Sequence, residues 1–381
     1  MTALITIITP VYNAEAHLEQ CLGSVRNQTF KDYEHLCVDD GSDDHSPALL
    51  DRYGASDHRA VIIHQHNAGA AVARNAALTQ AKGEFYAFLD ADDFVEPDWL
   101  EKLHEKAVRT NADIVIHPMT AFDASTNTFR PLPWSCQSAA YPDVFSWRDN
   151  PDKLFTSFHN WPCNKLFSAK LIRENDLSFQ EVPYTEDLRF TCAALALADR
   201  ITTVNEPLYV YRIGNPGSNL ARNERAPFDF FTAHAALKRF LEERNLYEPL
   251  KRSYRTWTAE SLLFQMRSYR QFETYTSVFS YLQSGGLEEL DLTCTPECFD
   301  SEEPAQFVRS ITEDELAEHL FKQARCEYAH RLDHEKTIDG LVGELNAYEA
   351  SLTWKIGDAV LTLPKLIRRI ASKKRGESTC G

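Results

Sequence analysis

Short apolar runs alternate with helix-length segments over the first 117 residues of this 381-residue chain. The runs cover residues 3–9, 33–38, 61–64, 85–89 and 114–117. Their length and their β-branched and aromatic residues predict strands, the first of which is expected to stop at Pro10. Strands that alternate with helices form a mainly parallel sheet covered by helices. The sequence therefore predicts a doubly wound α/β domain.

Polar residues follow four of these predicted strands closely. They are residues 9–13 (Thr-Pro-Val-Tyr-Asn), 39–42 (Asp-Asp-Gly-Ser), 67–69 (Asn-Ala-Gly) and 90–93 (Asp-Ala-Asp-Asp). Ligands of open α/β sheets bind in the crevice outside the carboxyl ends of the strands, so we expect these segments to line one crevice. For residues 39–42 alone, an ordinary turn followed by a helix cap is an equally good interpretation.

Asp90, Asp92 and Asp93 place three carboxylates within four residues. Such groups repel one another unless a cation neutralises them, which predicts a bound divalent metal ion. Oxygen ligands favour Mg²⁺ or Mn²⁺, and a metal held by one or two carboxylates usually completes its coordination with substrate phosphates. The chain has neither a P-loop nor a Gly-x-Gly-x-x-Gly motif after the first strand. These residues therefore predict a nucleotide diphosphate bound through a metal.

The formal net charge of −16 argues against a general nucleic-acid-binding protein, which needs a basic surface to displace counterions. The first residues show no secretory signal, and no stretch has the roughly 18 uninterrupted apolar residues of a membrane-spanning helix. We therefore expect a protein of the cytoplasmic side that does not cross the bilayer.

The ordered set of motifs resembles that of family 2 glycosyltransferases with the GT-A fold. The resemblance extends to about residue 220, through residues 9–13, 39–43, 67–69, 73–75, Gly83, 88–93, Pro97, 164–167, Glu186, Asp187, Phe190 and 207–212. It implies a GT-A domain (doubly wound, Rossmann-like) with a C-terminal helical extension. It also implies inverting transfer of a hexose or N-acetylhexosamine from a nucleotide diphosphate sugar, expected to be a UDP-sugar. The acceptor is expected to be a hydroxyl of a bacterial-type surface polysaccharide or its lipid-linked precursor.

The resemblance assigns most of the residues in these motifs to donor binding. The donor-binding residues that it implies are Thr9, Pro10, Tyr12, Asn13, Glu15, Asp40, Asn67, Gly69, Arg74, Asp90, Ala91, Asp93 and Arg212. Tyr12 is expected against the base, Asp40 at the base edge, and Asp92 on the metal ion between the diphosphate oxygens. Loop packing is the alternative for Thr9 and Tyr12.

The same resemblance makes Asp187 the general base, at the start of a predicted helix that runs through Ala198. The alternative for Glu186 and Asp187 is a favourable interaction with the helix dipole, which is compatible with the catalytic role. Glu186 is expected to orient the site or an acceptor hydroxyl. Trp161 and Lys165 are expected in the acceptor wall, with a buried core tryptophan as the alternative. For Arg74 and Arg212, a surface ion pair and a solvent-facing side chain are the alternatives.

Beyond residue 222 the family motifs fade. We predict a catalytic domain at 1–222, a helical domain at 223–310, and a C-terminal helix at 311–381. Apolar residues at three- and four-residue steps over 338–352 predict a short heptad seam, which would serve a homo-oligomer or pack back on the enzyme. The basic, amphipathic end from 354 to 375 predicts peripheral attachment to the anionic inner face of the cell membrane, with a solvated tail as the alternative.

Two other functions are alternatives to sugar transfer for a chain with these motifs. A sugar-nucleotide nucleotidyltransferase shares an acidic metal site on an α/β domain, but it needs a glycine-rich basic loop after the first strand, and residues 9–13 are not one. A non-catalytic scaffold that oligomerises through residues 312–352 has no need for Asp92 and Asp187, both of which are present.

Overall fold

The computed structural model describes residues 4–213, 224–326 and 337. The chain divides into two compact units, Met1–Glu313 and Asp314–Gly381. In the second unit, residues 316–326 and residue 337 are helical. The predicted seam at 338–352 and the basic end at 354–375 lie outside the described residues.

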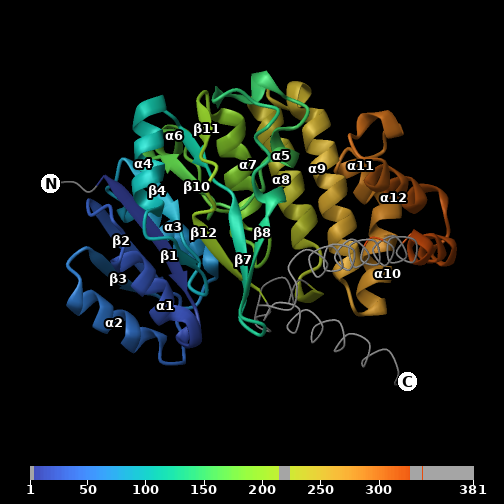
Figure 1. The fold of residues 1–381 in the computed structure, drawn as a ribbon. Coiled ribbons are helices and arrows are strands. Elements are labelled where there is room, and N and C mark those ends of the chain that lie inside the picture. The colour runs from blue at the N-terminus through green and yellow to red at the C-terminus, as the bar shows by residue number, and fades with distance from the viewer. Residues whose placement is uncertain (1–3, 214–223, 327–336, 338–381) are drawn as a thin grey trace, which may run out of the picture. The chain divides into compact units, whose positions relative to one another are not determined.

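An eight-stranded mixed sheet forms the centre of the first unit (Figure 1). Its strands, in spatial order, are β3 (Ala60–His64), β2 (Tyr33–Asp39), β1 (Ile5–Val11), β4 (Phe85–Phe88), β10 (Lys165–Ser168), β6 (Ile114–Ile116), β11 (Ile201–Thr203) and β9 (Val144–Phe145). The first four strands are parallel, as the alternating pattern predicts. The sheet is not parallel throughout, because β10 runs antiparallel between β4 and β6, and β9 runs antiparallel to β11.

The strand prediction was wrong at Pro10, because β1 continues through this residue to Val11. The carbonyl of Ile8 accepts a hydrogen bond from Leu89 on the β4 side. Pro10, two residues further, faces the same side, where the ladder with β4 has already ended at Phe88. The missing N–H of proline therefore costs no ladder hydrogen bond.

A four-stranded sheet lies next to the acidic segment 90–93 in the chain. Its order is β5 (Phe94–Val95), β12 (Tyr209–Ile213), β7 (Met119–Asp123) and β8 (Thr128–Leu132). β5 follows Asp93 directly and pairs antiparallel with β12, so strands 115 residues apart in the chain meet beside the acidic segment.

Helices cover both faces of the large sheet. They are α1 (Glu15–Arg26), α2 (Ser46–Ser56), α3 (Ala70–Gln80), α4 (Trp99–Thr110), α5 (Leu154–Ser157), α6 (Ala169–Glu174) and α7 (Asp187–Leu197). Alternate strand residues enter different cores: Ile8 and Phe88 pack with α3 and α7, whereas Ile7 and Leu89 pack with α1 and α4. This two-sided burial explains why β1 and β4 are mainly apolar on both faces.

The helical extension continues the core of the α/β part. It comprises α8 (Asp229–Glu243), α9 (Tyr247–Ser268), α10 (Phe272–Tyr281), α11 (Leu287–Glu289) and α12 (Glu302–Glu313). Leu237 and Leu241 of α8 and Leu250 and Tyr254 of α9 are buried in the cluster that contains α7. Among the described residues, no helix combines the length and the apolar character that a membrane span requires.

Candidate active site

The loops that follow β1 and β2 are joined by side-chain hydrogen bonds. Asn13 has a left-handed backbone (φ 48°), which asparagine tolerates better than most residues. Its Nδ2 donates to Oδ1 of Asp43 (2.7 Å), and the Asp43 N–H donates back to Oδ1 of Asn13 (2.9 Å). The Asn13 N–H also donates to Oγ of Ser42 (3.0 Å). Tyr12, in the same loop, is 49 % exposed and thus accessible to a ligand.

Asp40 organises the loop after β3. Its Oδ1 accepts from Nε2 of Gln65 (2.7 Å) and from the N–H of Ala68 (2.9 Å), and its Oδ2 accepts from the N–H of Gly69 (2.8 Å). A carboxylate offers about four acceptor positions, so one remains for a ligand N–H. The predicted donor residues Asp40, Asn67 and Gly69 are therefore brought together.

Gly41 allows the β2 loop to approach the β3 loop. Its backbone is left-handed (φ 72°), and a Cβ at this position would lie 2.7 Å from the backbone N of Asn67. Any side chain would thus clash with main chain and strain the turn.

Arg74 joins two predicted parts of the site. Its Nη2 donates to Oδ1 of Asp90 (2.8 Å), and its Nη1 donates to Oε1 of Glu186 (2.8 Å). The Arg74 side chain is 7 % exposed, so this is a buried bridge and not the surface ion pair considered as its alternative. It links the acidic turn after β4 to the start of α7 across 112 residues.

Asp187 begins α7 beside this bridge. Burial, and then the negative charge of Glu186, raise the pKa of its carboxyl well above the ordinary value, whereas the positive charge of Arg74 lowers that pKa. A carboxylate with a raised pKa is a better proton acceptor when ionised. The surroundings of Asp187 therefore suit a general base, and its role stays a prediction.

Asp93 faces the protein interior. Its Oδ2 accepts from the Tyr209 hydroxyl (2.7 Å), and its Oδ1 accepts from the Arg212 N–H (2.7 Å). Burial, followed by repulsion from Asp92 and Asp90, raises the pKa of Asp93 well above its ordinary value. Both carboxylate oxygens thus anchor the acidic turn to β12, and the predicted contact with the donor sugar has no support from these bonds.

Arg212 is also held against the acidic turn. Its Nε donates to the carbonyl of Asp92 (2.8 Å) and its Nη2 donates to Oε1 of Gln20 (2.6 Å). The guanidinium lies over the rings of Phe94 (5.6 Å) and Phe122 (5.3 Å). The side chain is therefore not solvent-facing, and as placed it supports the Asp92 backbone.

The segment 214–218, which follows Arg212, lies outside the described residues. The resemblance to family 2 glycosyltransferases implies that this segment closes over the donor phosphates, which stays a prediction.

Lys165 is buried, and its ammonium is engaged by its own segment. Nζ donates to the carbonyl of Trp161 (2.8 Å), to Oδ1 of Asn164 (2.7 Å) and to the carbonyl of His159. Burial lowers the pKa of Lys165 to about 8. Lys165 therefore shapes the loop that carries the half-buried Trp161, and does not itself line an acceptor wall.

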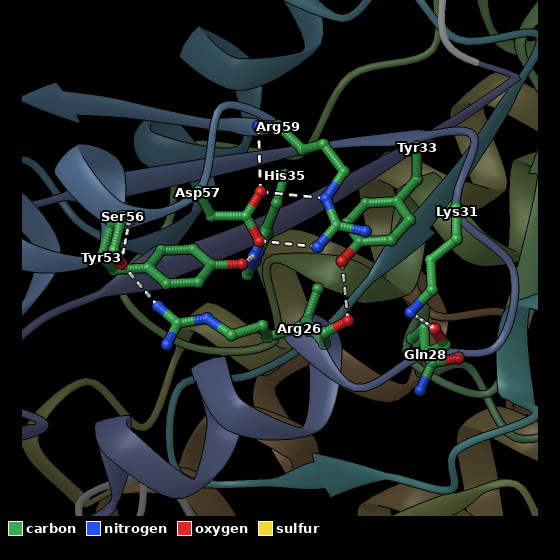
Figure 2. A network of polar contacts seen from close by, with 10 residues as sticks. Arg26, Gln28, Lys31, Tyr33, His35, Tyr53, Ser56, Asp57 and Arg59 are labelled. Carbon is green, nitrogen blue, oxygen red and sulfur yellow. Dashed lines mark hydrogen bonds and ion pairs between the residues drawn. The ribbon is translucent and has the colours of Figure 1, made fainter.

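Thr9 points into the interior between β1 and β2. Its hydroxyl shares a hydrogen bond with Nε2 of His35 (2.9 Å), and Nδ1 of His35 shares one with the Tyr53 hydroxyl (3.0 Å). Burial lowers the pKa of His35 to about 3, so this ring is neutral. Figure 2 shows His35 and Tyr53 near the ion pair of Arg59 and Asp57. Thr9 thus belongs to an internal network, and a contact with the donor finds no support.

Three other predicted donor residues have structural roles. Pro10 lies opposite Val38 in the β1–β2 ladder, and Ala91 is buried in a small apolar cluster. The Glu15 carboxylate accepts from the N–H of His45 (2.9 Å) and so ties α1 to the β2 loop. These residues therefore support the loops at the carboxyl ends of the strands.

The acidic turn fits a metal bound mainly by substrate phosphates. No group of three or more His, Cys, Asp or Glu side chains able to hold a metal occurs in the part of the chain that the structure describes. Asp93 has both oxygens bonded to protein, and Oδ1 of Asp90 is bonded to Arg74. The charge repulsion within the turn is what a cation would relieve. That Asp92 is the Mg²⁺ or Mn²⁺ ligand stays a prediction from the family resemblance.

Sequence reasoning assigned no role to Tyr209, Gln65, Gln20 or His17. Tyr209 lies in the motif at 207–212, so its position was a usable signal. His17 and Gln20 share one face of α1, and the pKa of His17 is lowered by burial and by Arg212 and raised by Asp92. The spacing of three residues between these polar side chains, near the start of a helix, was the sequence signal that they lie together beside Arg212.

A model of the family described as Glycosyl transferase family 2 matches residues 6–175. The Bacillus subtilis protein EpsH is 30 % identical over 270 residues, which cover 67 % of this chain and 74 % of EpsH. The glycosyltransferase GlyG of Streptococcus pneumoniae is 30 % identical over 222 residues, which cover 56 % of this chain and 71 % of GlyG.

Among solved structures, residues 1–349 of Staphylococcus aureus TarS in complex with UDP-GlcNAc superpose with a TM-score of 0.61 and 20 % identity. The match covers 81 % of this chain and 88 % of that one. It confirms the predicted GT-A fold with a helical extension, and the sequence relatives confirm the family. The chain therefore belongs to glycosyl transferase family 2.

Proposed function

We propose that this protein is an inverting glycosyltransferase that transfers a hexose or N-acetylhexosamine from a UDP-sugar to a hydroxyl of a surface polysaccharide or its lipid-linked precursor. The observation that carries the proposal is the Arg74 bridge between Asp90 and Glu186. It couples the acidic turn, where a diphosphate would bind, to Asp187, where an acceptor would be deprotonated. The UDP donor is supported by TarS, which has been crystallised with UDP-GlcNAc.

Asp187 is the proposed general base. Inversion requires a base opposite the leaving group, placed to take the proton of the attacking hydroxyl. Burial and Glu186 raise the pKa of Asp187 and so increase its basicity, whereas Arg74 lowers that pKa and so favours the ionised form that accepts the proton. Glu186, fixed by Arg74, orients the acceptor side of the site.

The loops after β1, β2 and β3 form the donor side of the proposed site. Tyr12 is exposed for stacking on the base, and the remaining acceptor position of Asp40 suits a base N–H. Asp92 would hold a Mn²⁺ or Mg²⁺ ion, which when bound stabilises the charge of the UDP leaving group. Asp93 and Arg212 hold the turn that presents Asp92.

Calorimetry of UDP binding and a UDP-release assay together test this proposal. Metal-free protein is titrated with UDP with and without Mn²⁺, and UDP release is measured for a panel of UDP-, GDP- and dTDP-sugars. We expect release from a UDP-sugar, and a loss of about tenfold or more in Mn²⁺-dependent UDP affinity for Asp92→Asn. Asp98→Asn, which alters a half-exposed carboxylate paired with Lys102, is the matched control. Full metal dependence in Asp92→Asn, or turnover of no UDP-sugar, contradicts the proposal.

We also propose that the enzyme acts at the inner face of the cell membrane. The support is the composition of the C-terminal end, which has six cations between residues 365 and 375: Lys365, Arg368, Arg369, Lys373, Lys374 and Arg375. Basic residues near an anionic surface each contribute about 1 kcal/mol, and a lipid-linked acceptor would be met there. The seam at 338–352 is proposed to join copies of the chain.

A further inference from the structure

Three aromatic side chains from separate segments pack ring against ring and are here called the aromatic platform: Trp134, Trp161 and Tyr211. The ring centroids of Tyr211 and Trp161 lie 5.0 Å apart, and those of Trp161 and Trp134 lie 5.6 Å apart. Trp134 lies in the short helical turn Pro133–Ser135 after β8 and is 38 % exposed. The platform thus extends from β12 to the solvent.

The platform begins at the acidic turn. Tyr211 and Tyr209 are two residues apart on β12 and so share one face of that strand. The Tyr209 hydroxyl donates to Asp93 (2.7 Å) and accepts from the N–H of Asp90 (3.2 Å). After burial, the charges of Asp93, Asp92 and Asp90 are the largest causes that raise the pKa of Tyr211. A ligand on the platform would therefore lie next to the proposed donor site.

Buried groups hold the platform in place. Nζ of Lys165 bonds the carbonyls of both Trp161 and His159. The His159 ring packs 4.3 Å from the ring of Trp161 and 4.8 Å from that of Trp134. Burial lowers the pKa of His159 to about 3, so it acts as a neutral spacer between the indoles. A site that is ordered before binding loses less entropy when a ligand arrives.

The polar ends of the platform are available to a ligand. The indole N–H groups of Trp134 and Trp161 and the hydroxyl of Tyr211 bond to none of the residues that the structure describes. Aromatic side chains with one apolar face and one polar end suit ligands that are themselves amphipathic. A pyranose ring is such a ligand, because its C–H face is apolar and its hydroxyls surround it.

The charges near the platform disfavour an anionic acceptor. Asp90, Asp92 and Asp93 lie at one end, and Lys165 is fully buried with three acceptors on its ammonium. With the donor bound, a phosphate on the acceptor would meet both these carboxylates and the donor diphosphate, and it would gain nothing from this lysine. A neutral sugar has no such cost.

We infer that Trp134, Trp161 and Tyr211 form the acceptor subsite, and that the acceptor is a neutral saccharide of two or more rings. The inference rests on the proposed glycosyltransferase function, and it names the chemical class of its second substrate. A polyol-phosphate chain, the acceptor named for TarS, is the alternative that the experiment must distinguish.

Ligand-observed NMR and calorimetry with full-length protein and UDP test the acceptor directly. The probes are neutral di- and trisaccharides of glucose, galactose and N-acetylglucosamine, and a ribitol-phosphate trimer. We expect at least one neutral oligosaccharide to bind, and Trp134→Ala to weaken that binding about tenfold, since stacking faces dominate such sites. Tyr211→Phe keeps the ring but lacks the hydroxyl, and we expect its affinity for the oligosaccharide to fall a few-fold. Phe264→Ala on α9, where the phenyl group is 57 % exposed, is the matched control and should bind as the parent does.

Three outcomes would overturn the inference. They are binding of the trimer more tightly than every neutral oligosaccharide, binding of no neutral oligosaccharide, and unchanged binding in Trp134→Ala. Circular dichroism checks folding, and Trp134→Phe, with an expected intermediate affinity, replaces the alanine variant if that variant unfolds. Absence of donor turnover in the parent would instead refute the proposed function, because saccharide binding is measured without chemistry.

Discussion

Replacing Arg74 tests whether the two ends of the site act as one unit. Its guanidinium makes two hydrogen bonds of 2.8 Å, to Asp90 and to Glu186, and its side chain is 7 % exposed. A lysine ammonium can keep one of these bonds, so Arg74→Lys should lower the free energy of unfolding by about 1.5–3 kcal/mol, the contribution of one charged hydrogen bond. Arg74→Met leaves the Glu186 carboxylate, 10 % exposed, without its counter-charge, and should cost about 3–5 kcal/mol.

The two variants should differ in the pH dependence of transfer. Arg74 lowers the pKa of Asp187, whereas burial and Glu186 raise it. Without the positive charge, as in Arg74→Met, the pKa of Asp187 rises further. Because the base must be ionised to accept a proton, the acidic limb of the kcat/KM profile should move to higher pH. Arg74→Lys keeps the charge, so its acidic limb should stay near that of the parent.

The measurements are kcat/KM against pH and urea unfolding of the same preparations. Arg59→Met is the matched control, because Arg59 also makes two contacts with one buried carboxylate, that of Asp57 (2.9 and 2.7 Å; Figure 2). This ion pair lies just before the start of β3 and therefore away from the carboxyl ends of the parallel strands. Arg59→Met should lose stability without any shift of the profile. An unmoved acidic limb in folded Arg74→Met, or an equal shift in Arg59→Met, would refute the reasoning.

Three further predictions follow from single features. Asp187→Asn should lower transfer by roughly 10² to 10⁴ with little change in UDP affinity by calorimetry. The pKa of Asp187 is raised by folding, so its ionisation destabilises the folded state. The melting temperature of Asp187→Asn should therefore exceed that of the parent at pH 8 and equal it near pH 4. Transfer equal to that of the parent would contradict the base role. Gly41→Ala, with its Cβ 2.7 Å from Asn67, should cost about 1–3 kcal/mol of stability and weaken UDP binding, and an unchanged melting temperature would count against the clash. Deletion of residues 351–381 should abolish co-sedimentation with anionic liposomes while donor hydrolysis persists, and raised salt should release the intact protein by screening; a full-length protein that ignores such liposomes at low salt would refute this.

The early strands and the polar loops at their carboxyl ends were predictable because their signals are local. The apolar runs before Asp40 and Asp90 are as long as a strand, and polar residues directly follow them, so the position of these carboxylates at one sheet edge needed only the rule for parallel strands. The order of the motifs was enough to predict the family. The strand at 165–168 was not predicted, because its four residues carry no periodicity and its antiparallel place between β4 and β6 depends on a chain excursion of about 50 residues.

The sequence by itself determined which chemistry the chain can carry, through the acidic turn, the Asp40 loop and the Glu186–Asp187 pair. Only the tertiary structure decided which protein group each buried motif residue bonds to. Arg74 became a bridge to Glu186, Asp93 an anchor for β12, and Lys165 the support of the Trp161 loop. The physical reason is that residue type and spacing specify backbone periodicity and available functional groups, whereas the partner of each buried polar group is set by packing between segments more than 100 residues apart.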